Sequence, residues 1–418
     1  MKKRIRSKVD FVYWYLLFYI FWGFIFTRTV FENTLLVYFS FIFLLGAFAT
    51  KLFSKASNIS GVILCCIPYL LYTSLGYLVQ ADFQRMSYWL VALFVIMVSQ
   101  KDNISAKLSY RELYVFGLIA FAGIMFQLFF TSLYNSAITP LFLNDNSERW
   151  VESSYGYNGF TYQLAATAEI LIIAEMVVLF LWNRAGFSSK QWVKYAIAIA
   201  LAVGVFLTGK RTNSAMAILV PVLVFFIGNR ATIKKRGYGF LIVIALVAGV
   251  YLFRENLSSL TESVIFRRTA NSMVGYETGD DFSGGREFMW LRAISLYHEH
   301  PVFGIGLGNF TRVGGFDTDV HNMYLQCLCE QGTVGFILFL IMIVTCLIVT
   351  IRSVRKAVDS QNKALLMFSL ACQLSYMLEG ITENMNVNLD GYLVYAIAVG
   401  IMVHCKSKEQ LYINRSNK

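Results

Sequence analysis

The sequence is poor in charged residues. They make up 15% of its 418 residues, against about 25% in a typical soluble domain, whereas hydrophobic residues make up 57%. Even a large soluble domain leaves about a quarter of its unfolded surface in water, and so few polar residues could not cover it. The same scarcity excludes a disordered chain. We therefore expect lipid to surround most of this chain.

Proline and paired cysteines are also scarce. Of four prolines, Pro68 and Pro221 fall inside predicted helices, where we expect kinks. The cysteines show no paired spacing, which excludes a disulfide-built secreted scaffold; they lie mainly in apolar runs, at positions 65, 66, 327, 329, 346, 372 and 405. No small-residue cleavage site follows the first apolar run, so we expect an uncleaved first helix.

Long apolar runs are abundant. A membrane-spanning helix needs roughly 20 apolar residues, with about 17 as a minimum. Twelve runs approach or exceed this length, at 11–27, 34–50, 61–79, 86–99, 113–134, 163–182, 191–208, 212–228, 238–253, 333–351, 364–380 and 391–405. The sequence predicts an all-α membrane bundle of about 12 transmembrane helices. Its parts would be 1–253 with nine helices, a large extracytoplasmic loop at 254–332, and 333–418 with three helices and a cytoplasmic tail.

The distribution of basic residues predicts the orientation. With a cytoplasmic N-terminus, 25 of the 36 Lys and Arg residues fall in cytoplasmic segments and 11 fall outside. Cytoplasmic enrichment of Lys and Arg is the usual topology signal. Both termini are therefore predicted to be cytoplasmic, and the net charge of +11 requires no nucleic-acid partner.

Lys210 and Arg211 depart from this pattern. They form a tight turn between two predicted helices, Thr208-Gly209-Lys210-Arg211-Thr212, on the predicted outer side. The pair could snorkel at a helix end. Alternatively, it forms a fixed cationic site for an anionic headgroup, because Arg binds phosphate through a planar fork of donors. The turn by itself leaves both readings open.

The segment 254–332 is too long for a simple connector, because structureless loops of this length are usually functional or disordered. Residues 286–298 predict an amphipathic helix whose apolar stripe consists of Met289, Trp290, Ala293, Ile294 and Tyr297. A second short helix is predicted from His321 to Glu330, stopping at Gly332. On that helix His321 shares the apolar stripe, so we expect its side chain to face inward.

Histidine is rare, with four residues in the chain. The dipole at a helix N-terminus disfavours imidazolium, so His321 would keep the neutral form that can accept a proton; a purely structural histidine is the alternative. His298 and His300 flank the end of the first loop helix, where a cation is stabilising.

Other signals are weaker. Gly304-Ile305-Gly306-Leu307-Gly308 lacks the G-x-G-x-x-G spacing and the βαβ context of a nucleotide loop. No cluster of acids with histidine resembles a metal site, although the acidic pairs Asp280-Asp281 and Asp317/Asp319 leave a cation open; we predict no metal and no cofactor. Glu169 and Glu175 lie in a predicted membrane helix, where ionisable groups are functional suspects, but structural hydrogen bonding is the favoured reading.

Several motifs together resemble the O-antigen ligase and Wzy polymerase superfamily. They are Arg286 with Trp290, the run Glu299-His300-Pro301-Val302-Phe303-Gly304-Ile305-Gly306-Leu307-Gly308-Asn309-Phe310, and His321-Asn322-Met323-Tyr324-Leu325-Gln326 with Glu330, Gly332 and Gly335. The 208–211 turn looks like the Ser-Arg turn of that family. Gly159-Phe160 looks like its Gly-x-Phe element, although Tyr162-Gln163 departs from the Pro-Asn that follows there. The resemblance is strong over about 205–335.

The resemblance implies a GT-C-like bundle whose large loop is catalytic. It implies an inverting glycosyltransferase that acts on undecaprenyl-pyrophosphate-linked glycan at the outer face of the bacterial cytoplasmic membrane. His321 would be the base for an acceptor hydroxyl, with Arg211 and Arg286 on the pyrophosphate. Preorganised cations stabilise the charge that develops on such a leaving group. We also place Lys210, Trp290, Asn322, Glu330 and His300 in the substrate site.

Two reactions fit this resemblance. A polymerase joins a lipid-linked chain to another lipid-linked repeat unit, and a ligase passes the chain to lipid A core or another final acceptor. We favour the polymerase. A lipid-linked oligosaccharide flippase would also have about 12 helices but would place its functional charge along a central cavity. The expected partners are the donor and acceptor glycans and membrane lipid, with a chain-length regulator and a flippase of the same pathway by analogy.

Overall fold

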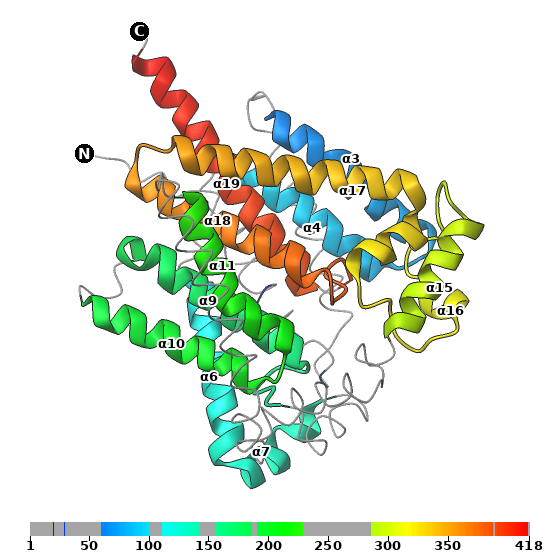
Figure 1. Ribbon diagram of the computed structural model, residues 1–418, viewed down its shortest axis with the longest axis horizontal. Helices are drawn as coiled ribbons and strands as arrows, with labels where there is room; N and C mark the ends of the chain where they lie inside the picture. Colours follow the sequence, from blue (N-terminus) through cyan, green and yellow to red (C-terminus); the bar gives the residue numbers. More distant parts are fainter. Residues whose placement is uncertain are drawn as a thin grey trace, which may run out of the picture.

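The computed structural model describes residues 60–100, 111–142, 156–185, 190–228, 286–387 and 389–416, with residues 20 and 29 (Figure 1). Over these ranges the chain is helical, and its extended pairing is limited to an isolated bridge between Thr29 and Phe142. The all-α prediction is confirmed for this part of the chain.

The described part of the chain consists mainly of helices. In chain order they are α3 (Gly61–Val79), α4 (Phe83–Ser99), α6 (Glu112–Phe129), α7 (Thr131–Ala137), the 3-10 turn η2 (Thr139–Leu141), α9 (Leu164–Ala185), α10 (Gln191–Leu207), α11 (Arg211–Gly228), α15 (Arg286–Glu299), α16 (Phe310–Gly314), α17 (Met323–Lys356), α18 (Ser360–Glu379) and α19 (Leu389–Ser416).

Five of the described helices, α3, α6, α9, α11 and α17, are long and apolar enough to cross a membrane, and α4 and α10 are shorter apolar helices. A helix of about 20 residues rises roughly 30 Å, the thickness of the hydrocarbon core of a bilayer. The chain is thus an integral membrane protein. Nine predicted spans coincide with helices. The other three, 11–27 (apart from residue 20), 34–50 and 238–253, lie outside the described residues. The total of about 12 therefore stays a prediction, as do the three-part division and the orientation.

The prediction of one span over 113–134 was wrong at its end. The helix α6 stops at Phe129, because Phe130 leaves the helical conformation with φ −127° and ψ 46°. The short helix α7 then buries Tyr134, whose hydroxyl donates to the carbonyl oxygen of Gly159. A buried hydroxyl needs such a partner, and reaching it turns the chain away from the axis of α6.

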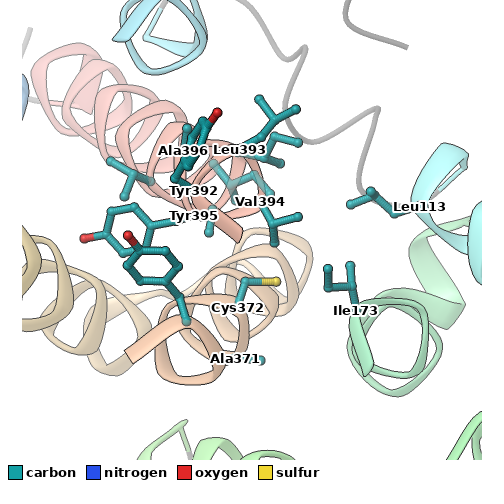
Figure 2. Packing of buried hydrophobic residues seen from close by; sticks show 14 of the residues in the cluster. Leu113, Ile173, Ala371, Cys372, Tyr392, Leu393, Val394, Tyr395 and Ala396 are labelled. Carbon is teal, nitrogen blue, oxygen red and sulfur yellow. The ribbon is translucent and has the colours of Figure 1, made fainter. Parts of the chain in front are cut away.

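The core of the bundle lies along α4, α19, α18 and α9: α4 packs on α19, α19 packs on α18, and α18 packs on α9. In Figure 2 side chains of α19, including Tyr392 and Tyr395, lie close to Cys372 of α18, with Ile173 of α9 nearby. Trp89 of α4 stacks on Tyr392 with ring centroids 4.8 Å apart. These contacts hold the C-terminal helices, and the loop between them, against the rest of the bundle.

The outer faces of α3 and α17 are apolar. Exposed apolar residues recur at intervals of three, four or seven positions, at Leu64, Leu71, Leu75 and Leu78 on α3 and at Ile337, Ile341, Val344 and Ile348 on α17. This spacing forms one stripe along a helix. In an integral membrane protein such a stripe faces lipid.

A break divides α17 into two helical parts. At Gly332 the backbone has φ 62° and ψ −167°, a conformation that glycine adopts without a steric cost. The glycine-rich loop, residues 301–308, lies in the break: a Cβ added at Gly332 would stand 2.4 Å from the carbonyl carbon of Val302. The predicted stop at Gly332 is confirmed.

Main-chain hydrogen bonds join the glycine-rich loop to this break. The amides of Ile305 and Gly306 donate to the carbonyl oxygens of Cys329 and Glu330, both at 2.9 Å. In the other direction, the Thr333 amide donates to the carbonyl oxygen of Pro301 at 2.8 Å. These bonds satisfy backbone groups that the helix itself leaves without partners at the break.

The helix α15 confirms the predicted amphipathic helix, and Figure 1 shows it with α16 beside the N-terminal end of α17. It buries Met289, Ala293 and Leu296, with Trp290 and Tyr297 packed alongside. Ile294, which we assigned to the same stripe, is 37% exposed. The buried stripe is turned slightly because Leu296, three residues after Ala293, faces the core.

Candidate functional site

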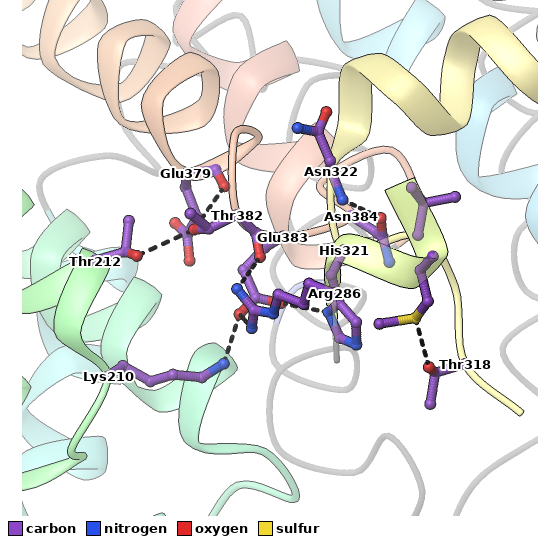
Figure 3. A network of polar contacts seen from close by, with 12 residues as sticks. Lys210, Thr212, Arg286, Thr318, His321, Asn322, Glu379, Thr382, Glu383 and Asn384 are labelled. Atoms are coloured by element: carbon purple, nitrogen blue, oxygen red, sulfur yellow. Dashed lines mark hydrogen bonds and ion pairs between the residues drawn. The ribbon is translucent and has the colours of Figure 1, made fainter. Parts of the chain in front are cut away.

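Charged and polar side chains from four separate parts of the chain meet at one end of the bundle (Figure 3). The parts are the turn 208–212 between α10 and α11, the first residue of α15, the segment 318–322 before α17, and the loop 380–387 between α18 and α19. We refer to Lys210, Arg211, Arg286, His321 and Glu383, which they supply, as the polar cluster.

The 208–212 turn directs Lys210 into the polar cluster. Gly209 has φ 68°, which closes the turn, and α11 starts at Arg211. The Lys210 Nζ atom lies 2.6 Å from Oε1 of Glu383, and the two side chains are 19% and 12% exposed. Lys210 thus forms a partly buried ion pair within the protein.

Two guanidinium groups add to this positive charge. Arg286 donates from Nη1 to the carbonyl oxygen of Thr382 at 3.0 Å, and its Nη2 lies 3.5 Å from Oε1 of Glu383. Arg211 lies close enough to Arg286 for their positive charges to act on each other. Two cations, Lys210 and Arg286, therefore contact one carboxylate, and Arg211 lies near Arg286. Glu379 accepts a hydrogen bond from Asn213 at 2.7 Å close by. Such a group of cations favours binding of an anion.

His321 has a left-handed backbone with φ 54°, which it shares with Ala81 alone among the described non-glycine residues. This conformation costs a non-glycine residue roughly 1–3 kcal/mol and needs support from its surroundings. The support comes from both sides. Trp290 Nε1 donates to the carbonyl oxygen of Val320 at 3.1 Å, and the amide of Asn322 donates to Oδ1 of Asn384 at 3.1 Å.

The prediction that a helix starts at His321 was wrong. The helix begins at Met323, and Asn322 is its N-cap: Oδ1 of Asn322 accepts from the amides of Tyr324 and Leu325 at 3.0 Å. An N-cap residue has extended backbone and stands before the first helical residue. His321 therefore precedes the cap and has no place on the apolar stripe, so the stripe does not account for the orientation of its side chain.

The imidazole of His321 contacts a carboxylate. Its Nδ1 lies 3.4 Å from Oε2 of Glu383. Nδ1 is buried and makes no well-aligned hydrogen bond, yet the side chain as a whole is 31% exposed. The exposed part is thus the other edge of the ring, which includes Nε2. This edge is the one a substrate can approach.

Glu383 joins the cations to the histidine and is itself buried. Burial would raise the pKa of Glu383, but Lys210 and the contact with His321 outweigh burial and hold this pKa well below its usual range. The sequence analysis missed Glu383 and its neighbours Thr382 and Asn384. The signal was present: a polar run, 379–386, between two apolar spans, on the same predicted side as the large loop.

The other predicted substrate-site residues have structural contacts. Glu330 is 2% exposed, and its Oε1 accepts from the amide of Phe310 at 3.1 Å, so it holds the chain that follows the glycine-rich loop. Trp290 and Asn322 support the backbone around His321. His300 is exposed and follows the last residue of α15. It lies about 20 Å along that helix from Arg286, so the structure does not bring it to the polar cluster.

Glu169 and Glu175 are buried in α9 at 8% and 5% exposure. Among the described residues no group of three His, Cys, Asp or Glu side chains is placed to hold a metal ion. The polar cluster itself consists of three cations, one imidazole and one carboxylate at one end of the bundle.

A comparison with protein families connects this site to a known class. Residues 196–340, roughly a third of the chain, match the family described as O-antigen ligase, Wzy_C. The chain thus carries a domain of the O-antigen ligase and Wzy superfamily, and the resemblance seen in the sequence is confirmed. No curated protein matches the chain.

This family implies a membrane glycosyltransferase-like ligase or polymerase with lipid-linked glycan substrates. The matched region includes Lys210, Arg211, Arg286 and His321 but ends before Glu383. Four members of the polar cluster therefore come from the family domain, and the carboxylate comes from the C-terminal part of the chain.

Proposed function

We propose that this protein is a polymerase of undecaprenyl-pyrophosphate-linked oligosaccharide repeat units for a surface polysaccharide, with the polar cluster as its active site at the outer face of the cytoplasmic membrane. The observation that carries the proposal is the meeting of Lys210, Arg211 and Arg286 with an accessible histidine edge. Glycosyl transfer from a pyrophosphate needs cations and a base in this combination.

The reaction is a single displacement at the anomeric carbon of the donor sugar. A hydroxyl oxygen of the acceptor glycan forms a bond to C1, while the bond from C1 to the pyrophosphate oxygen breaks and its electron pair leaves with undecaprenyl pyrophosphate. His321 takes the hydroxyl proton at Nε2, the accessible edge of the ring. Attack opposite the leaving group inverts the configuration at C1.

The cations act on the leaving group. Negative charge grows on the pyrophosphate as the bond to C1 breaks, and cations fixed in advance stabilise that charge more than they stabilise the bound donor. Arg211 and Arg286 have the planar fork of donors that fits phosphate oxygens. Lys210 adds a point charge at the same place.

A ligase would use the same chemistry with lipid A core or another final acceptor. The flippase alternative differs more, because it would need no base beside the cations. The polymerase and the ligase differ only in the acceptor, so the experiment must report which product forms.

The test is the size ladder of the surface glycan in a deletion strain complemented with wild type, His321→Ala, Arg211→Ala or Arg292→Ala. We expect the deletion strain to keep single repeats on their acceptor and to lose the ladder. Wild type and Arg292→Ala should restore it, because Arg292 forms an exposed pair with Glu299 away from the polar cluster. The other two variants should not.

The other outcomes separate the alternatives. Full-length chains that accumulate on undecaprenyl pyrophosphate would identify a ligase. A normal ladder with both His321→Ala and Arg211→Ala would remove the site assignment and favour the flippase.

A further inference from the structure

Glu383 uses its two carboxylate oxygens for different partners. Oε1 faces the cations, with Lys210 Nζ at 2.6 Å and Arg286 Nη2 at 3.5 Å. Oε2 faces the histidine, with His321 Nδ1 at 3.4 Å. Figure 3 shows the carboxylate between these groups. One side chain therefore links the charges expected to bind the donor with the base expected to act on the acceptor.

The contacts of the two Glu383 carboxylate oxygens differ in length and in hydrogen-bond geometry. The contact with Lys210 has the length of a strong charge-assisted hydrogen bond. The contact with His321 is longer, and Nδ1 has no well-aligned partner. A buried imidazole nitrogen without a hydrogen bond is costly, so a carboxylate freed from Lys210 would gain by turning fully towards His321.

The pyrophosphate of the donor could release the Glu383 carboxylate from Lys210 and Arg286. A pyrophosphate carries more negative charge than one carboxylate and offers several oxygens to the forked donors of arginine. It would compete with Glu383 for Lys210 and Arg286, because both ligands need the same donor atoms. Two anions on the same cations repel each other, which drives the carboxylate towards the imidazole.

We propose that Glu383 is a positioning residue that holds Lys210 and Arg286 until the donor pyrophosphate replaces it, and that then binds Nδ1 of His321. This inference rests on the proposed function and adds a coupling between donor binding and the base. With Nδ1–H donated to Glu383, Nε2 becomes the acceptor nitrogen. The carboxylate also stabilises the imidazolium that forms when the acceptor proton is taken.

The exchange predicts that pyrophosphate binding and turnover respond differently to the loss of the Glu383 charge. Glu383→Gln keeps the shape and removes the charge. It should bind pyrophosphate as tightly as wild type or several-fold more tightly, because no carboxylate competes for the cations. Its kcat should fall on the order of a hundredfold or more, the size of a general-base contribution, while KM for the donor stays the same or falls. Glu383→Asp keeps the charge and should recover part of the kcat.

The experiment uses the full chain in lipid nanodiscs. Binding of inorganic pyrophosphate is measured by calorimetry at low ionic strength, and turnover is measured with lipid-linked repeat units. Glu299→Gln is the matched control, because it also removes an acid paired with an arginine, on the far end of α15, with Arg292 Nη1 at 3.3 Å. It should change neither quantity.

Two results would overturn the inference. If Glu383→Gln loses pyrophosphate binding along with kcat, the carboxylate only holds the cations in place. If kcat is unchanged, it has no role in positioning His321. Should Glu383→Gln fold poorly, the kcat of Glu383→Asp against its pyrophosphate affinity carries the same test. Failure of the proposed function is a separate result: wild type would then make no glycan product, whatever residue stands at position 383.

Discussion

Among single residues, Glu383 has the most contacts to other parts of the polar cluster. It is buried, yet its carboxyl group is charged because Lys210 and His321 outweigh the cost of burial. A buried charge is tolerated only when partners of this kind surround it. The same partners determine how the group responds to pH.

The lowered pKa of Glu383 predicts an acid-sensitive contribution to stability. A carboxyl group with a lowered folded-state pKa stabilises the fold above its unfolded pKa, about 4.3, and loses this contribution as the pH falls through the folded value. We therefore expect Glu383→Gln to melt at a lower temperature than wild type at pH 7. The loss corresponds to roughly 2 kcal/mol, as for other hydrogen bonds to charged groups.

The measurement is thermal melting of both proteins in nanodiscs between pH 3 and pH 8. The difference in melting temperature between the two proteins should be constant above about pH 5 and should narrow below about pH 4. Protonation of the Glu383 carboxylate then destabilises wild type, whereas Glu383→Gln has no carboxyl group at this position to protonate. A gap that keeps its full size down to pH 3 would contradict the assignment of Glu383 as the charged partner.

Residue types explain which site residues were predictable. Lys210 broke a charge pattern, and Arg286 and His321 belonged to recognisable motifs. The only signal for Glu383 was the polar run 379–386, which is weak because a single acid in a short loop is common; its partner Lys210 is 173 residues away in the sequence. Glu330 and Trp290 make structural contacts, and their substrate roles stay predictions, because motif membership does not distinguish a residue that touches substrate from one that holds the backbone.

Among the elements, α17 depends on the glycine-rich loop for hydrogen bonds at its break. The helix gives up its regular bonds at Gly332, and the glycine-rich loop supplies replacements from residues 301–308. Periodicity predicted both helical parts and the stop between them. It could not predict the partner of the break, because hydrogen bonds between distant backbone groups leave no pattern in the sequence.

The close fit at the break predicts that Gly332→Ala is strongly destabilising. A Cβ there would lie 2.4 Å from the carbonyl carbon of Val302, and the residue has φ 62°. Strain and overpacking together should cost about 2–5 kcal/mol. The measurement is the melting temperature in nanodiscs, which should fall by several degrees.

Gly61→Ala is the matched control. Gly61 is the first residue of α3, and no atom lies within 4 Å of its added Cβ. Alanine is a better helix former than glycine, so this variant should melt at the same temperature or slightly higher. Equal melting temperatures for Gly332→Ala and wild type would show that the loop does not pack in the break.

On the scale of the whole molecule, the polar cluster exists only because the bundle brings separate connections together. The 208–212 turn and the loop 380–387 touch through the hydroxyl groups of Thr212 and Thr382, whose oxygens are 3.1 Å apart. Hydropathy and charge predicted that both connections lie on one side of the membrane. The pairing of these two connections required the packing of α11 on α18.

This contact predicts a disulfide in the double variant Thr212→Cys/Thr382→Cys. Cysteine side chains at these positions would bring two sulfur atoms within bonding reach. Oxidation with copper phenanthroline should remove two maleimide-reactive thiols relative to the reduced protein. Glycan transfer should fall on oxidation, because the bond restricts the loop that carries Glu383, and it should return with a reductant.

Thr212→Cys/Ser360→Cys provides the comparison. Ser360 starts α18, and Thr382 follows the end of that helix, so the two ends are roughly 30 Å apart. No thiols should be lost from this pair. If both pairs react alike, or neither does, the two connections do not meet as the structure places them.

At position 321 the residue that would give the most stable fold differs from the residue that the proposed reaction requires, because the backbone is left-handed. Glycine adopts φ near 54° freely, whereas histidine there costs roughly 1–3 kcal/mol. Selection for a more heat-resistant protein would therefore favour glycine at position 321, and the product would be a well-folded protein without the proposed base. If His321 is the base, as we propose, it gives up part of the folding free energy for chemistry, and screening variants by melting temperature alone would discard it.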